Sequence, residues 1–80
     1  MKSIRNYIID NDLKIIIYKN KIDIQNYTDI GSISEKEINI YIDKTKIVII
    51  GNKLKVEKLL SSEILILGTI NYLKFEGINE

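Results

Sequence analysis

The 80-residue sequence contains no cysteine, histidine or tryptophan. Without cysteine, the fold can use neither disulfides nor thiolate metal sites. A secreted domain this small would often carry disulfides, so their absence favours a reducing cytoplasm. The chain also lacks the commonest general base, histidine, and a favoured nucleophile, cysteine. These absences predict a protein that is not an enzyme and that binds no metal or cofactor.

Strong charge and long apolar runs are missing as well. The formal net charge is +1, with acidic and basic residues interleaved, which argues against nucleic-acid binding. The apolar stretch after Arg5 ends at Asp10, too early for a signal peptide or a membrane span. We therefore expect one soluble cytoplasmic domain over residues 1–80, with a leading segment at 1–12 and a core at 13–76.

One pattern occurs twice in the chain. Residues 14–24 and 46–56 each contain an apolar run, a polar turn and an alternating run. The turns are Lys19-Asn20-Lys21 in the first copy and Gly51-Asn52-Lys53 in the second. Such a pattern is typical of a β-hairpin, so the sequence predicts two hairpins.

The remaining patterns also favour strands. Isoleucines alternate with polar residues over 38–42, and apolar runs follow at 64–67 and 70–75. The last run slips in phase, which predicts a β-bulge near Asn71-Tyr72. Residues 26–35 are interpreted as a loose connection. We expect an all-β fold, a small β-sandwich or roll of about seven short, mostly antiparallel strands.

Two acidic groups could in principle carry chemistry. Asp10-Asn11-Asp12 resembles the start of a calcium loop, but the later ligands are missing, so a turn is the better interpretation. Glu35 and Glu37 share one strand face, yet they flank Lys36 at the start of a strand, where solvated carboxylates are expected. A hydrolase that uses this pair ranks last among the functions considered.

Several predicted strands are apolar on both faces. A small two-layer domain dries one face of each sheet, so something must cover the other. Either loops and the N-terminal segment fold over it, or it forms an interface with another protein. The candidate interaction surface consists of Ile16, Tyr18, Tyr41, Val48, Ile50, Leu65, Leu67 and Tyr72.

From Leu13 to Phe75 the chain resembles the YabP/YqfC family of sporulation proteins, and the YabP and YqfC-like branches both stay open. The resemblance lies in residues 22–27, 37–40, 46–54 and 63–75. Its most telling element is the order and spacing of a few positions. These positions are Asn26, Tyr27, Gly51 and Gly68. The turns at 18–20 and 43–45 lack the glycine that the family often has there.

The resemblance implies a β-sandwich-like fold, no catalytic residue and a role in spore formation. We expect a non-enzymatic adaptor or assembly factor that acts through protein–protein contacts at the forespore envelope, in the mother-cell cytoplasm. The implied partner is a YqfD-like membrane protein, and a homo-oligomer is the other candidate assembly. The alternative function is a small-ligand or carbohydrate-binding β module.

Overall fold

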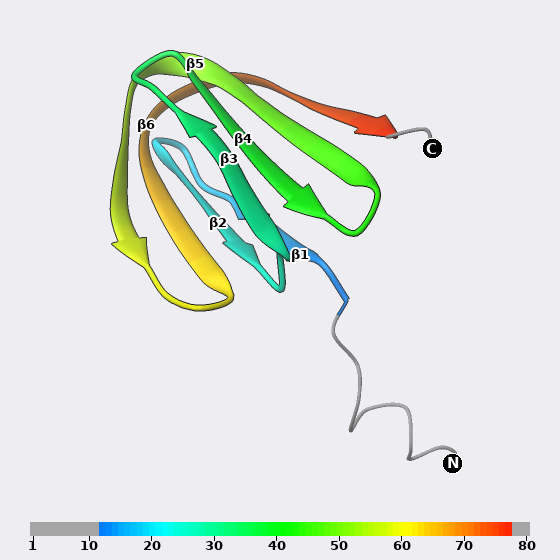
Figure 1. Cartoon of the computed structure of the whole chain (residues 1–80). Helices are drawn as coiled ribbons and strands as arrows, with labels where there is room; N and C mark the ends of the chain where they lie inside the picture. The colour runs from blue at the N-terminus through cyan, green and yellow to red at the C-terminus, as the bar shows by residue number, and fades with distance from the viewer. Residues whose placement is uncertain (1–11, 78–80) are drawn as a thin grey trace.

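The structure, a computed structural model, describes residues 12–77 and contains six strands and no helix in this part of the chain (Figure 1). The strands are β1 (Lys14–Ile17), β2 (Lys21–Gln25), β3 (Asp29–Ile33), β4 (Glu37–Ile42), β5 (Thr45–Leu59) and β6 (Glu63–Gly77). They form one antiparallel sheet in the order β1-β2-β6-β5-β4-β3. The prediction of an all-β, antiparallel fold is confirmed.

The hairpin of β5 and β6 bends the sheet over on itself. Each of these strands is 15 residues long, and both turn sharply near their middles (Figure 1). The first layer contains β3, β4, residues 45–50 of β5 and residues 70–77 of β6. The second layer contains β1, β2, residues 55–59 of β5 and residues 63–67 of β6. A single open sheet thus provides two layers.

Irregular backbone produces the bend. The pairing of β5 with β6 shifts register three times, between Ile50 and Lys58. At this place Lys53 has a φ of 54° and Gly68 a φ of 131°. Bulges of this kind increase local twist and redirect a strand. The shift next to Ile50 leaves Asn71 without a partner in β5, so the predicted bulge near Asn71 is confirmed.

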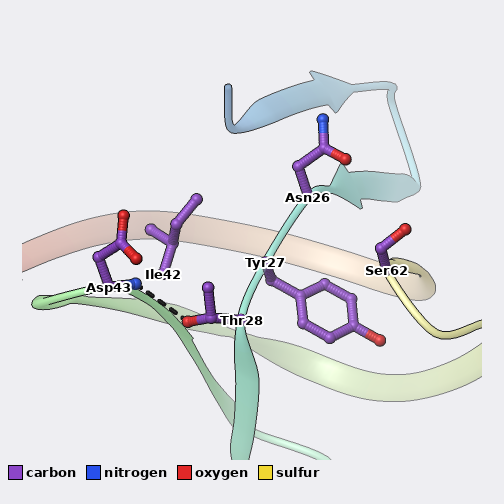
Figure 2. Close-up of a pocket in the computed structure, with 6 residues that line it drawn as sticks. All are labelled: Asn26, Tyr27, Thr28, Ile42, Asp43 and Ser62. Carbon is purple, nitrogen blue, oxygen red and sulfur yellow. Dashed lines mark hydrogen bonds between the residues drawn. The ribbon is translucent and has the colours of Figure 1, made fainter. Parts of the chain in front are cut away.

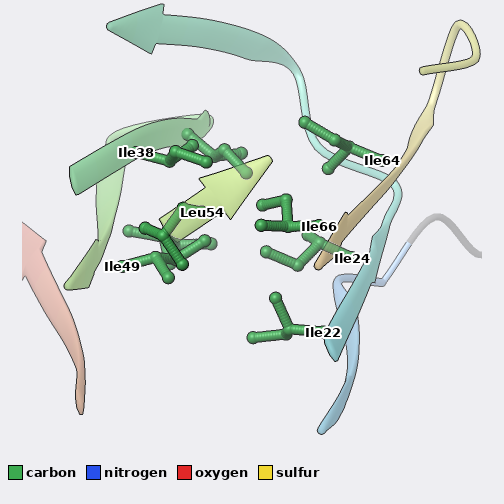
Figure 3. Packing of buried hydrophobic residues seen from close by; sticks show 9 residues of the cluster. Ile22, Ile24, Ile38, Ile49, Leu54, Ile64 and Ile66 are labelled. Atoms are coloured by element: carbon green, nitrogen blue, oxygen red, sulfur yellow. The ribbon is translucent and has the colours of Figure 1, made fainter. Parts of the chain in front are cut away.

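Isoleucine fills the space between the layers. Side chains alternate across a strand, so every second residue of β2 and β4 points inward, and so does every second residue of β5 and β6 on either side of their bulges. The core contains nine buried residues: Ile22, Ile24, Ile38, Ile40, Ile47, Ile49, Leu54, Ile64 and Ile66. Figure 3 shows Ile38 and Ile49 facing Ile24 and Ile66 from the opposite layer. Each buried isoleucine contributes about 1.5–3 kcal/mol relative to an exposed one.

Two details of the sequence prediction are wrong. Residues 14–25 form the expected hairpin, β1–β2, whereas residues 46–56 form no hairpin and lie within the continuous strand β5. Gly51-Asn52-Lys53 bends β5 without reversing it, because β5 stays paired with β6 on both sides of the bend. The sheet accordingly has six strands, two of them long.

The other wrong detail is the loose connection at 26–35, which contains β3. Its sequence, Asp-Ile-Gly-Ser-Ile, has weak strand propensity, and contacts with β4 hold it in place. The Asn39 amide donates a 2.7 Å hydrogen bond to Ser32 Oγ, and the Tyr41 ring lies over Gly31. Residues 1–11 of the predicted leading segment (1–12), including Asp10 and Asn11 of the predicted Asp10-Asn11-Asp12 turn, lie outside the described residues.

Candidate interaction surfaces

The eight predicted surface residues divide between two opposite faces of the molecule. The core residues of each layer point inward, so the alternate residues lie on its outer face. The first layer carries Tyr41, Val48, Ile50 and Tyr72 outside, and the second carries Ile16, Leu65 and Leu67, with Tyr18 beside them. The structure therefore contains two candidate surfaces, which one flat partner cannot cover together.

The outer face of the first layer is only partly apolar. Ile50 lies opposite Tyr72, whose side chain is 58% exposed. Val48, in contrast, is only 5% exposed, so it offers little area to a partner. Tyr41 lies over Gly31 and contributes to holding β3. Charged residues occupy much of the rest of this face.

The outer face of the second layer carries a carboxylate between two apolar residues. Asp23 of β2 lies opposite Ile16 on one side and Leu65 on the other. Its Oδ1 atom is buried and has no hydrogen-bond partner, while Oδ2 accepts a long 3.4 Å bond from Gln25. A buried acceptor without a donor is unfavourable. The carboxylate would gain from a donor that a bound molecule supplies.

Lysine surrounds this second face. Lys21 lies opposite Leu67, and its Nζ is 4.7 Å from the centre of the Tyr18 ring. Lys55 also lies opposite Leu67, and Lys58 lies opposite Leu65. The face therefore combines half-buried aliphatic side chains, two carboxylates (Asp23 and Glu63) and several bordering lysines.

The corner between β2 and β3 joins the two layers. Asn26 adopts a positive φ of 70°, and its amide donates a 2.8 Å hydrogen bond to the carbonyl of Asp12. The Tyr27 hydroxyl donates a 2.7 Å bond to the carbonyl of Leu60, in the β5–β6 turn. Thr28 Oγ1 donates to the Tyr41 carbonyl and accepts from the Asp43 amide. Through these hydrogen bonds the corner connects the segment before β1, the β5–β6 turn and the end of β4.

A pocket of about 460 Å³ opens at this corner (Figure 2). It is lined by Asn26, Tyr27, Thr28, Ile42, Asp43 and Ser62. Ligand sites usually pair an apolar lining with a few available polar groups. Here the donors of the Asn26, Tyr27 and Thr28 side chains are already engaged within the chain. The pocket is better explained as the inside of a structural corner.

The structure also exposes large apolar residues that the sequence did not single out. These are Ile17, Ile33, Leu59, Leu60 and Phe75. Phe75 lies opposite the fully buried Ile47, on the inner face, yet it is 54% exposed. Strand alternation places it correctly on that face. The alternating sequence pattern does not indicate how far the opposite layer extends. The sequence therefore could not predict that Phe75 is exposed.

In residues 12–77 the acidic pair is exposed, and neither a metal-ligand cluster nor a membrane-spanning helix is present. Glu37 is the first residue of β4 and Glu35 lies in the turn before it, and both are exposed. Within residues 12–77 no group of three or more histidine, cysteine or acidic side chains is arranged to hold a metal ion. The same residues contain no helix that could cross a membrane.

Comparison with known proteins gives one finding. The family model described as the YabP family matches residues 11–80. No curated protein and no solved structure gave a significant match. The matched region includes every strand of the sheet, the β2–β3 corner and both glycines of the bend. The chain therefore belongs to the YabP family.

Proposed function

We propose that this protein is a non-enzymatic sporulation protein that acts as a small β-sheet adaptor or assembly factor. It works at the forespore envelope, from the cytoplasm of the mother cell, through contacts with another protein. Membership of the YabP family supports the role in spore formation, because the related YabP/YqfC proteins are sporulation proteins.

The observation that carries the adaptor role is the Asp23 carboxylate on the outer face of the second layer. Its Oδ1 atom is buried between Ile16 and Leu65 and has no donor within the described chain. A partner that lies on this face, moves the Ile16 or Leu65 side chain aside and donates a hydrogen bond to Oδ1 would remove that unfavourable term. It would also cover the half-buried Leu65 and Leu67. Asn39 Oδ1, on the outer face of the first layer, is likewise buried without a donor. We therefore choose the second face for its half-buried Leu65 and Leu67 and for the lysines that border it.

The partner we propose is a YqfD-like membrane protein, which the YqfC-like resemblance implies. The lysines that border the face favour a partner segment with acidic residues at its edge and apolar residues at its centre. The alternative, a small-ligand or carbohydrate-binding module, has less support, since Tyr27 is the one aromatic residue that lines the corner pocket.

The test is co-purification with the YqfD-like protein of the same bacterium, together with genetic complementation. Leu65→Ser removes apolar area next to Asp23 and should weaken capture of the partner by about tenfold or more, as loss of an interface anchor does. Ile50→Ser makes a similar change on the outer face of the first layer and should leave capture unchanged. Thermal unfolding of both variants checks that each remains folded.

Spore formation provides the second readout. Deletion of the gene should reduce the number of heat-resistant spores, and the wild-type gene and Ile50→Ser should restore it while Leu65→Ser does not. Unchanged sporulation in the deletion strain would refute the proposed role. Equal loss of capture in the two variants would refute the choice of face.

A further inference from the structure

The second half of β6 has one free edge. β2 pairs with β6 only as far as Leu67, and within residues 12–77 no other strand pairs with that edge of residues 70–77. Figure 1 shows this part of β6 running along the margin of the fold to the C-terminal end. On its other edge, the pairs from Tyr72 to Gly77 follow β5 without a register shift. This edge is a long, regular template for another strand.

The other edges of the described sheet are less suited to pairing. β1 has only four residues, and β3 contains a register shift between Ile30 and Ile33. The second half of β5 contains further shifts, and the carbonyls of Glu35 and Lys36 accept bonds from Leu54 and Gly51 next to it. Short length and bulges are features by which proteins protect sheet edges. Beyond the bulge at Asn71, residues 72–77 of β6 have neither.

Exposed aromatic residues flank the free edge on both faces. Tyr72 is 58% exposed on the outer face, and Phe75 is 54% exposed on the inner face. Both rings are large side chains in a strand, where cross-strand aromatic pairs are stabilising. Next to Phe75, Lys74 and Glu76 form an exposed ion pair at 3.3 Å on the outer face. The edge thus combines apolar area with two opposite charges.

This arrangement is complementary to itself. When a two-fold axis relates two antiparallel strands, the numbers of any two opposite residues add up to twice the number of the residue at the axis. The side chains of each opposite pair lie on the same face of the sheet. An axis at Phe75 places Phe75 against its copy and Lys74 against Glu76 of the other chain, twice. An axis at Lys74 would place two lysines opposite each other, which is unfavourable. Only the register centred on Phe75 pairs Lys74 with Glu76 of the other chain, so charge favours it.

We infer that two copies of this chain associate through the β6 edge, with residues 73–77 paired antiparallel about Phe75. The dimer joins the first layers of the two copies into one continuous sheet. Glu76 then lies between Lys46 of its own β5 and Lys74 of the second copy. Both outer faces remain open, so this dimer does not depend on the proposed function, and its test is separate from the capture of a partner.

A charge swap tests both the dimer and its register. Light scattering after size exclusion, over a range of protein concentrations, should show a monomer–dimer equilibrium for the wild type. K74E places two carboxylates opposite each other at both ends of the contact and should weaken the dimer by about tenfold or more. The triple variant K46E/K74E/E76K inverts all three charges, including that of Lys46, which faces Glu76 in the same chain, and should restore the dimer in the same register. K36E changes the net charge equally in an exposed turn and is the matched control.

A second pair of variants tests the aromatic contact. F75T should weaken the dimer, whereas L60T, which removes a similarly exposed side chain from the β5–β6 turn, should not. Circular dichroism establishes that each variant keeps its strands. A chain that stays monomeric up to its solubility limit refutes the inference. A dimer that neither K74E nor F75T weakens also refutes the inference. The same holds if I16K on β1 disrupts that dimer instead.

Discussion

At the scale of single residues, two glycines determine whether the sheet can fold over. Gly51 lies so close to β6 that a Cβ atom placed on it would be 2.0 Å from the carbonyl oxygen of Thr69. Gly68 has a φ of 131°, and its Cβ would lie 2.7 Å from the carbonyl oxygen of Lys53. Both obstacles are backbone atoms of the neighbouring strand, which cannot rotate away. The bend therefore requires the absence of a side chain at both positions.

Replacement of either glycine by alanine should destabilise the fold strongly. We expect G51A and G68A each to lower the free energy of unfolding by about 2–3 kcal/mol or more, because the backbone must shift or adopt a strained conformation. G77A is the matched control, since no atom lies within 4 Å of its Cβ position, and it should change stability by about 0.5 kcal/mol or less. Urea unfolding at one low protein concentration measures all three. Equal stability of G51A and G77A would contradict this account of the bend.

At the scale of elements, the same local pattern gives two different structures. The chain reverses at residues 18–20 to form the β1–β2 hairpin, whereas at residues 51–53 it only bends. The sequence correctly predicts most of the extended segments and which faces are apolar, because alternation is a local property. It could not predict that β6 continues past the bend and keeps β5 extended. It also missed β3, which is held by Asn39 and Tyr41 of β4 and not by its own propensity.

The β2–β3 corner is the second element on which the layered arrangement depends. Tyr27 joins it to the β5–β6 turn through its hydroxyl, a donor only while the phenol is neutral. Partial burial raises the pKa of Tyr27 above its ordinary value of 10.0. The fold thus favours the neutral form. The contribution of Tyr27 to the free energy of unfolding is fully present below pH 10, and it is lost as the pH rises through the raised pKa.

Tyr27→Phe should therefore show a pH-dependent effect. At neutral pH it should lower the free energy of unfolding by about 0.5–1.5 kcal/mol, the usual net value of one hydrogen bond. Above pH 10 its difference from the wild type should shrink, because the ionised phenol of the wild type no longer donates. The control is Tyr72→Phe, which alters an exposed ring and should stay close to the wild type. Urea unfolding at several pH values gives the comparison, and a constant difference would contradict the role of the hydroxyl.

At the scale of the whole molecule, the two layers have no separate cores. The buried cluster takes Ile22 and Ile24 from the second layer and Ile38 and Ile49 from the first (Figure 3). β5 and β6 each run through both layers. The candidate surfaces follow from this arrangement, since the inward isoleucines fix which residues lie outside. The sequence predicted the apolar residues of both surfaces, but it contained no information that they lie on opposite sides, because only the fold separates them.

Such a molecule should unfold as one unit. Ile24→Val in the second layer and Ile40→Val in the first should each cost about 1 kcal/mol, the usual effect of one buried methylene. Amide hydrogen exchange then distinguishes one unit from two. If the layers unfold together, either variant lowers the protection of the slowest amides in β2 and β4 alike, by about fivefold. Ile17→Val alters a side chain that is 60% exposed and should leave protection nearly unchanged. A loss confined to the layer that carries the substitution would show instead that the bend separates two independent halves.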